Sequence, residues 1–151
     1  MVSGFSSLLL PDAVFPSLSA SDRDGAIAEM VGGLRGRFPA HDWSGVEESL
    51  RHREMMGSTA IGGFAAIPHA KWLGGFFAAF GVSEPGMEFH SLDGKKVHMV
   101  FLLLSPAGKP GEHLKILAGI SRLVGEADFW EKIKSADGAE GKSGTIRLAS
   151  R

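Results

Sequence analysis

The chain has 151 residues, of which 44% are hydrophobic and 22% are charged, and its formal net charge is −1. These values fit one folded domain over residues 1–151 and exclude a disordered chain. A net charge this small does not indicate electrostatic binding to nucleic acid. The absence of cysteine excludes disulfide bonds, thiol nucleophiles and cysteine-ligated metal, and it is compatible with a reducing cytosol.

Two apolar stretches raise the question of a membrane, and neither has the required pattern. The first, near the N-terminus, follows no basic region and ends at Pro11 and Asp12, so it does not match a secretory signal. The second, residues 72–82, is about half of the ~20 residues that span a bilayer. We therefore predict a soluble, cytoplasmic protein with no direct membrane insertion.

The first half of the chain predicts two helices. Residues 21–37 have apolar side chains at helical spacing, with Ser21 as a plausible N-cap. The apolar residues of that stripe are Ala26, Ile27, Met30, Val31 and Leu34. Residues 42–55 contain Ser44 and Glu47 at the spacing of a capping box, which predicts a helix that starts there.

The middle of the chain predicts strands. Residues 63–67 and 73–80 are rich in glycine and alanine, and we interpret both as buried strands. The dipeptide Asp93-Gly94 is typical of a hairpin turn, and the apolar run 97–104 after it has the length of a buried strand.

The last third predicts helices again. Residues 111–125 are amphipathic, with His113 at the start of the inward-facing stripe, and residues 126–136 predict a second helix. A short final strand could follow at 144–149. Together these elements predict an α/β fold, an α+β sandwich in which a single mixed β-sheet is flanked by helices.

The motifs exclude several kinds of site. The six histidines, at positions 41, 52, 69, 90, 98 and 113, include no pair at the spacing of a helical zinc site, so we predict no metal. Residues 138–144 have a lysine-serine pair like that of a phosphate loop, but Ala136 stands where the first glycine is required. There is no nucleophile elbow of a serine hydrolase.

One segment has a chemistry that fits group transfer. His69 follows Pro68, which fixes the backbone beside it, and small residues leave room for a partner to approach. Arg53 offers a planar cation suited to phosphoryl oxygens, and Ser58 and Thr59 offer neutral donors. A histidine can carry a transferred group covalently, so these residues favour phosphoryl transfer.

These residues resemble the signature of a known family. Glu54, the pair Ile61-Gly62 and the run 66–70 (AIPHA) are similar to the signature of enzyme IIA domains of the phosphoenolpyruvate-dependent phosphotransferase system, in the mannitol, fructose and nitrogen class. Ala65 and Ala70 depart from it, where the family usually has a larger aliphatic residue and a glycine. The resemblance extends over residues 8–31 and 91–124 and is strongest to the nitrogen-regulatory branch.

The resemblance implies a function and a site. His69 would accept a phosphoryl group from an HPr-type phosphocarrier protein, Arg53 would hold phosphoryl oxygens, and His113 would support the acceptor. Ser58 and Thr59 would donate hydrogen bonds to the phosphate. The implied protein is a phosphotransferase component with a phosphohistidine intermediate, and it uses no cofactor and no metal.

Three readings of the function remain open. A nitrogen-branch phosphocarrier would use its phosphorylation state as a signal to a downstream regulatory protein. A sugar-specific enzyme IIA, for fructose or mannitol, would share the site and pass the phosphate to a IIB domain. A non-catalytic regulator would bind its partner by docking alone, and its binding would not depend on His69.

Overall fold

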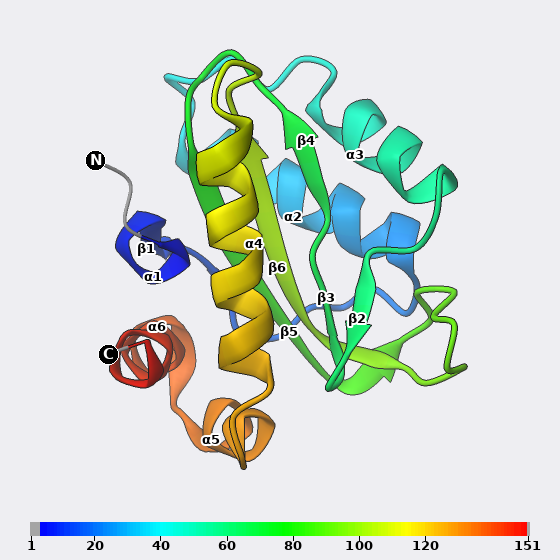
Figure 1. The fold of residues 1–151 in the computed structure, drawn as a ribbon, viewed down its shortest axis with the longest axis vertical. Helices are drawn as coiled ribbons and strands as arrows, with labels where there is room; N and C mark the ends of the chain where they lie inside the picture. Colours follow the sequence, from blue (N-terminus) through cyan, green and yellow to red (C-terminus); the bar gives the residue numbers. More distant parts are fainter. Residues whose placement is uncertain (1–3, 151) are drawn as a thin grey trace.

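The computed structural model describes residues 4–150, and within them helices flank a mixed β-sheet of six strands (Figure 1). The predicted fold class is confirmed. In chain order the elements are α1 (Phe5–Leu8), β1 (Leu9–Phe15), α2 (Arg23–Arg37), α3 (Val46–Met55), β2 (Ala60–Gly62), β3 (Ala65–Ala66), β4 (His69–Lys71), β5 (Phe77–Met87), β6 (Val97–Ser105), α4 (Pro110–Val124), α5 (Phe129–Ser135) and α6 (Gly138–Ala149).

The sheet is built around the antiparallel pair β5 and β6. Its strand order is β1-β5-β6-β3-β2, and β4 pairs with β6 beyond β3. Strand β1 is parallel to β5, and both β3 and β4 are parallel to β6. In Figure 1 helix α4 crosses the near side of the sheet, whereas α2 and α3 lie behind it. Because helices cover both faces, β6 is a continuous apolar run, not an alternating one.

The strand predicted at 97–104 is confirmed as β6, but the strand predicted at 73–80 starts later. Strand β5 begins at Phe77, because Gly75 has a φ of 91° and turns the chain before it. The predicted turn at Asp93-Gly94 exists, since Gly94 N–H donates to Ser91 O over 3.0 Å. It lies inside a longer connection, residues 88–96, so the hairpin has no two-residue loop.

The strand predicted at 63–67 is instead the end of a small hairpin. Strands β2 and β3 pair antiparallel, and Gly63 and Phe64 between them both have positive φ angles. The sequence also gave no indication of β1, whose Pro11 and Asp12 are typical of a loop. Arg37 stabilises this strand, because its Nη1 donates to Asp12 O and Val14 O.

The helix starts also differ from the prediction. The N-cap of α2 is Asp22, whose carboxylate accepts from Gly25 N at 2.8 Å, and not Ser21. The capping box predicted for α3 does not form. The N-cap is Gly45, in the left-handed region, and the Ser44 amide donates to Asp42 Oδ1. The helix therefore starts one residue later than the motif predicted.

The strand predicted at 144–149 is wrong, because these residues continue α6. Ile146 of this helix is buried in the core. The buried Lys142 joins α6 to the end of α5, since its Nζ donates to Ile133 O and Ala136 O over 2.8 and 2.7 Å. The helix satisfies the backbone groups of this segment within itself.

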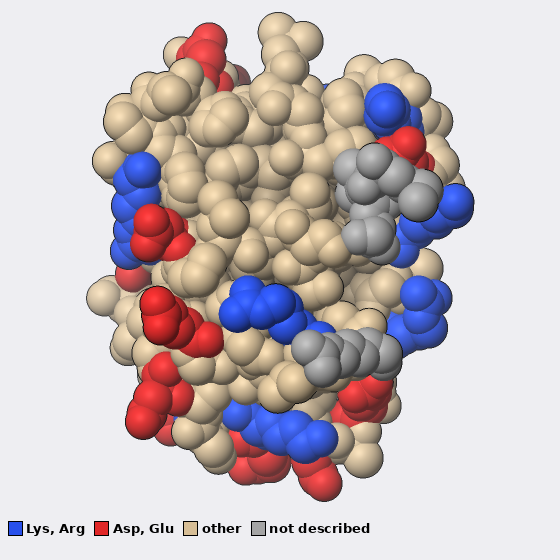
Figure 2. Space-filling model, turned by 90° about the vertical axis from the view of Figure 1, so that its left-hand side faces the viewer, with Lys and Arg blue, Asp and Glu red and all other residues tan. Residues whose placement is uncertain are grey.

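One hydrophobic cluster connects the sheet to the helices on both of its faces. None of the helices between residues 4 and 150 is long and apolar enough to cross a membrane. On the face drawn in Figure 2, acidic and basic residues are interspersed, and neither sign forms a continuous patch.

Candidate functional site

A break in the line of strands beside β6 positions His69. Strands β3 and β4 follow each other along β6, with Ala66 opposite Val100 and His69 opposite Leu103. Pro68 lies between the two strands, and it has no N–H to offer to the sheet. Its carbonyl still accepts from Leu103 N at 2.9 Å. The backbone of His69 is therefore held at the start of β4 while its side chain turns into a groove.

The ring of His69 is held in one tautomer. Its Nδ1 lies 2.8 Å from Ile67 O, and a carbonyl oxygen can only accept a hydrogen bond. Nδ1 therefore carries the proton in the neutral ring, and Nε2 keeps a free electron pair. This is the arrangement that an attacking imidazole requires.

The structure brings His113 next to His69, although the two residues are far apart in the sequence. The two ring centroids are 5.1 Å apart and the rings are tilted by 59°. His113 lies in the first turn of α4 and is buried, with 8% of its surface exposed. Its Nδ1 is 2.6 Å from the hydroxyl of Ser105, the last residue of β6.

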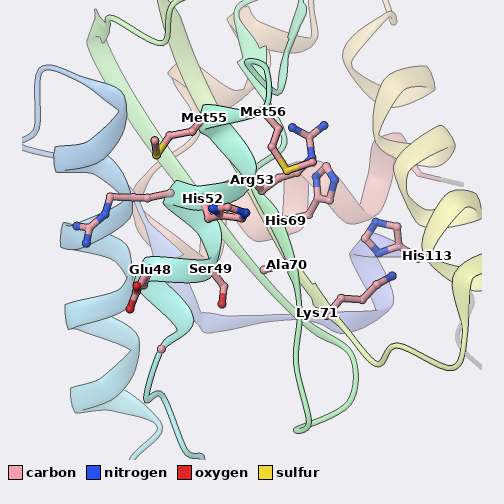
Figure 3. A pocket seen from close by; sticks show the side chains of 12 residues that line it. Glu48, Ser49, His52, Arg53, Met55, Met56, His69, Ala70, Lys71 and His113 are labelled. Atoms are coloured by element: carbon pink, nitrogen blue, oxygen red, sulfur yellow. The ribbon is translucent and has the colours of Figure 1, made fainter.

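Two cations complete the site. Arg53, in the last turn of α3, donates through Nη1 to Gly57 O over 2.9 Å, and Figure 3 shows the His69 ring between its guanidinium and His113. Lys71 stands two residues after His69 on β4, so both side chains are on the same side of the strand. The two histidines and the two cations line one groove of about 770 Å³. Its other lining residues are Gly45, Glu48, Ser49, Arg51, His52, Met55, Met56 and Ala70.

The surroundings keep both histidines neutral. Burial lowers the pKa of His69 and Arg53 and Lys71 lower it further, against the hydrogen bond to Ile67 O and the charge of Glu54, which raise it. Burial also lowers the pKa of His113, with added contributions from His69 and Lys71. Both pKa values therefore lie below that of an ordinary histidine, and an electron pair stays available at neutral pH.

The two hydroxyl residues of the prediction, Ser58 and Thr59, do not line the groove. Ser58 Oγ donates to Phe89 O at 2.8 Å. Thr59 is buried, and its Oγ1 and N–H donate to the two carboxylate oxygens of Glu54 over 2.5 and 3.2 Å. Thr59 therefore braces Glu54 at the end of α3, next to Arg53, whereas Ser58 is bonded to the connection that follows β5.

The other four histidines have separate surroundings. His41 and His90 are exposed, and the exposed His52 lines the groove, as its position on α3 requires. His98 is half-buried on β6, where its Nδ1 lies within hydrogen-bonding distance of Ser83 O and Glu84 O. Among residues 4–150 no three histidine or acidic side chains converge to form a metal site.

The segment after Lys71 is partly core and partly surface. Trp72 stacks on Trp43 with centroids 5.1 Å apart, and Phe77 is buried. Leu73 between them is fully exposed. Sequence reasoning did not identify Lys71 as a site residue, although its position two residues after His69 on a strand was a usable signal. Ser105 gave no signal, because its neighbour His113 is on another element.

A mixed sheet that presents one imidazole in a groove, beside a second imidazole and a guanidinium, defines a class of small α/β proteins with a two-histidine site. Comparison with known proteins shows which family the chain belongs to. A family model described as "Phosphoenolpyruvate-dependent sugar phosphotransferase system, EIIA 2" matches residues 7–141. The chain therefore belongs to this family, and the resemblance predicted from the sequence is confirmed.

Individual relatives point to the nitrogen-regulatory members. The chain is 35% identical over 135 residues to a nitrogen regulatory protein of Bradyrhizobium diazoefficiens, covering 88% of each chain. It is 30% identical over 132 residues to the fructose-specific EIIABC component of Bacillus subtilis, of which it covers 21%. The crystal structure of nitrogen regulatory protein IIA-Ntr from Neisseria meningitidis matches with a TM-score of 0.83 and 26% identity, over 93% of this chain and 97% of that one.

Proposed function

We propose that residues 1–151 form a single phosphocarrier domain that accepts a phosphoryl group on His69 from the phosphohistidine of an HPr-type protein. The observation that carries this proposal is the pairing of His69 Nδ1 with Ile67 O, which leaves Nε2 as the nucleophile. Membership of the EIIA 2 family supports the same chemistry, because the family is part of a phosphotransferase system.

The step is an in-line displacement at phosphorus. The Nε2 electron pair of His69 forms a bond to phosphorus, and the P–N bond of the donor breaks with its electron pair returning to the donor imidazole. No proton is released, because His69 Nδ1 keeps its hydrogen and donates it to Ile67 O throughout. The positive charge that the phosphorylated ring acquires lies against this carbonyl, which stabilises it.

Arg53 and Lys71 stabilise the charge on the phosphoryl oxygens, and His113 donates to one of them. Arg53 gives up its bond to Gly57 O and turns its planar fork toward the phosphate. Catalysis of this kind depends mainly on positioning and charge stabilisation, which two cations and two imidazoles around one groove supply. In the absence of phosphate Thr59 is bonded to Glu54 of α3 and Ser58 to Phe89 O, so each hydroxyl donates to the phosphate only after it gives up that bond.

The intact mass of the protein tests the proposal. The protein is incubated with phosphoenolpyruvate, enzyme I and an HPr-type donor, beside His69→Ala and His113→Ala. We expect one acid-labile phosphate on the wild-type protein, none on His69→Ala, and slower uptake by His113→Ala. Uptake by folded His69→Ala would refute the assignment, and no uptake by the wild-type protein from any such donor would refute the carrier function.

Of the two carrier roles, the nitrogen-regulatory one is better supported than the sugar-specific one. The chain is 35% identical to the relative named as a nitrogen regulatory protein and 30% identical to the fructose-specific relative. A regulatory role predicts that binding of a target protein differs between the two phosphorylation states. A sugar-specific role predicts instead that the phosphorylated protein transfers its phosphate to a IIB domain, and docking alone predicts binding that His69→Ala leaves unchanged.

A further inference from the structure

The buried pair of Ser105 and His113 has a feature that the proposed function does not use. Ser105 is fully buried at the end of β6, and its Oγ lies 2.6 Å from His113 Nδ1. The backbone of Ser105 is fixed by the adjacent strand, because Ser105 O accepts from Trp72 N at 2.9 Å. The hydroxyl is therefore held at Nδ1 of the His113 ring.

The two histidines of the site have partners of different chemistry. His69 Nδ1 faces a carbonyl oxygen, which only accepts, so this ring is fixed with its proton on Nδ1. His113 Nδ1 faces a hydroxyl, which can donate or accept. A neutral His113 can donate to a phosphoryl oxygen only from Nε2, and this requires a partner that donates to Nδ1.

We propose that Ser105 is a positioning residue for phosphoryl transfer, whose hydroxyl donates to His113 Nδ1 and so directs an Nε2–H of His113 into the groove. The neutral rings of His69 and His113 then have opposite tautomers, one offering an electron pair and the other an N–H. The tautomer of His113 is inferred from the hydrogen-bond geometry alone. The effect of Ser105 on the rate of phosphoryl transfer rests on the proposed function.

The groups around His113 keep its ring neutral, and in a neutral ring the Ser105 hydroxyl decides where the single proton lies. His69 and Lys71, both on β4, face it and disfavour a second proton on its ring. With the ring neutral, the position of its one proton decides whether it attracts or repels a phosphoryl oxygen. When the dianionic phosphoryl group arrives and favours protonation, the Ser105 hydroxyl rotates to accept from Nδ1–H. A carbonyl can only accept and a backbone N–H can only donate, so neither could pair with Nδ1 in both protonation states.

The tautomers can be measured in the unphosphorylated wild-type protein. Long-range ¹H–¹⁵N spectra distinguish a protonated ring nitrogen from a bare one, and His69→Gln and His113→Gln assign the signals. We expect a proton on Nδ1 of His69 and on Nε2 of His113 above the pKa values of both rings. Neutral His113 with its proton on Nδ1 would overturn the proposal, whether or not the protein accepts phosphate.

A double-mutant cycle measures the effect on transfer. We expect Ser105→Ala to slow uptake of phosphate by His69 by about tenfold, the lower end of the loss seen when the orienting partner of a metal-binding histidine is removed. In a His113→Ala background the same change should have no further effect, because the hydroxyl acts only through that ring. Ser143→Ala, which removes an equally buried serine of α6 that accepts from Arg147, should leave the rate unchanged.

The cycle separates positioning from a merely structural role. A loss of equal size in the two backgrounds, or an unchanged rate for Ser105→Ala, would overturn the proposal. Ser105→Cys, which keeps a weak donor of similar size, should retain part of the rate and serves as the test variant if Ser105→Ala does not fold. A wild-type protein that takes up no phosphate would refute the proposed function, while the spectra would still decide the tautomer.

Discussion

At the scale of the residue, His69, His113 and Arg53 each have one defined hydrogen-bond partner. A backbone carbonyl fixes the proton of His69, and a buried hydroxyl pairs with His113. Arg53 is held by Gly57 O, a bond that is weak enough to exchange because it lies at the surface. The site is therefore neutral at His69 and His113 and has cations beside them in Arg53 and Lys71.

Replacement of Arg53 should slow transfer more than it changes folding. We expect Arg53→Gln to lower the rate of phosphate uptake about 100-fold, since it removes charge stabilisation of the phosphoryl oxygens. Arg53→Lys should recover only part of the rate, because an ammonium lacks the planar fork. Stopped-flow transfer from the phosphorylated donor gives these rates, with Arg35→Gln on the exposed side of α2 as the control. Equal rates for Arg53→Gln and the control would contradict the role.

Thr59 should contribute to stability through Glu54. The Glu54 carboxylate is buried with 2% exposure and accepts from Thr59 Oγ1 and N–H. Thr59→Val leaves one carboxylate oxygen without this donor, so the free energy of unfolding should fall by about 1.5–3 kcal/mol. Thr145→Val, which removes a bond from a partly exposed threonine to Gly141 O, should cost under about 1 kcal/mol. Similar losses for the two variants in urea unfolding would refute this account.

The two neutral histidines should make stability depend on pH. Their pKa values are lowered by folding, so the unfolded chain binds more protons as the pH falls below about 6.5. The free energy of unfolding therefore rises with pH through this window and falls on acidification. We expect a smaller loss between pH 7.5 and pH 5 for the double variant His69→Gln/His113→Gln. An identical loss in both proteins would show that these rings are not the cause.

At the scale of the element, two predictions from local sequence failed because a nearby residue makes a hydrogen bond that the pattern does not show. The Ser44–Glu47 spacing predicts a capping box, but Asp42 accepts the Ser44 amide first and Gly45 becomes the N-cap. Residues 144–149 have the β-branched character of a strand, and the two bonds from Lys142 hold the segment as a helix against α5. Neither competitor can be recognised from spacing alone.

Two adjacent glycines of α2 should respond oppositely to alanine. A Cβ on Gly32 would meet nothing within 4 Å, whereas on Gly33 it would lie 2.4 Å from Phe15 Cε2. Gly32→Ala should raise the free energy of unfolding by about 0.5–1 kcal/mol, because it removes backbone freedom from the unfolded chain. Gly33→Ala should lower it by about 1–3 kcal/mol, because the Phe15 ring is buried beneath Arg37 and has no room to move. Thermal or urea unfolding measures both, and effects of the same sign would contradict the packing.

At the scale of the whole molecule, the fold assembles the site from three distant segments. Arg53 comes from α3, His69 and Lys71 from β4, and His113 from α4. The order of helices and strands predicted the fold class, and the signature around His69 is the basis for proposing this histidine as the acceptor. The resemblance, and not spacing, predicted that His113 would lie near His69, because only the parallel pairing of β4 with β6 brings α4 to that edge.

Contacts between segments that are distant in the chain could not be predicted from the sequence. Strand β1 pairs with β5 across the sheet, and its partner cannot be read from its own residues. Ser58 and Thr59 look available beside the signature, yet their hydroxyls are used by Phe89 O and Glu54. The groove also contains Lys71, which no motif marks.

The most direct test of the central claim is the identity of the phosphorylated atom. The protein is labelled with ¹⁵N and phosphorylated by an HPr-type donor, and coupling between phosphorus and the ring nitrogens is read from its NMR spectrum. We predict coupling to Nε2 of His69 alone, because Ile67 O holds the proton on Nδ1. Phosphate on His69 Nδ1, or on His113, would contradict the account.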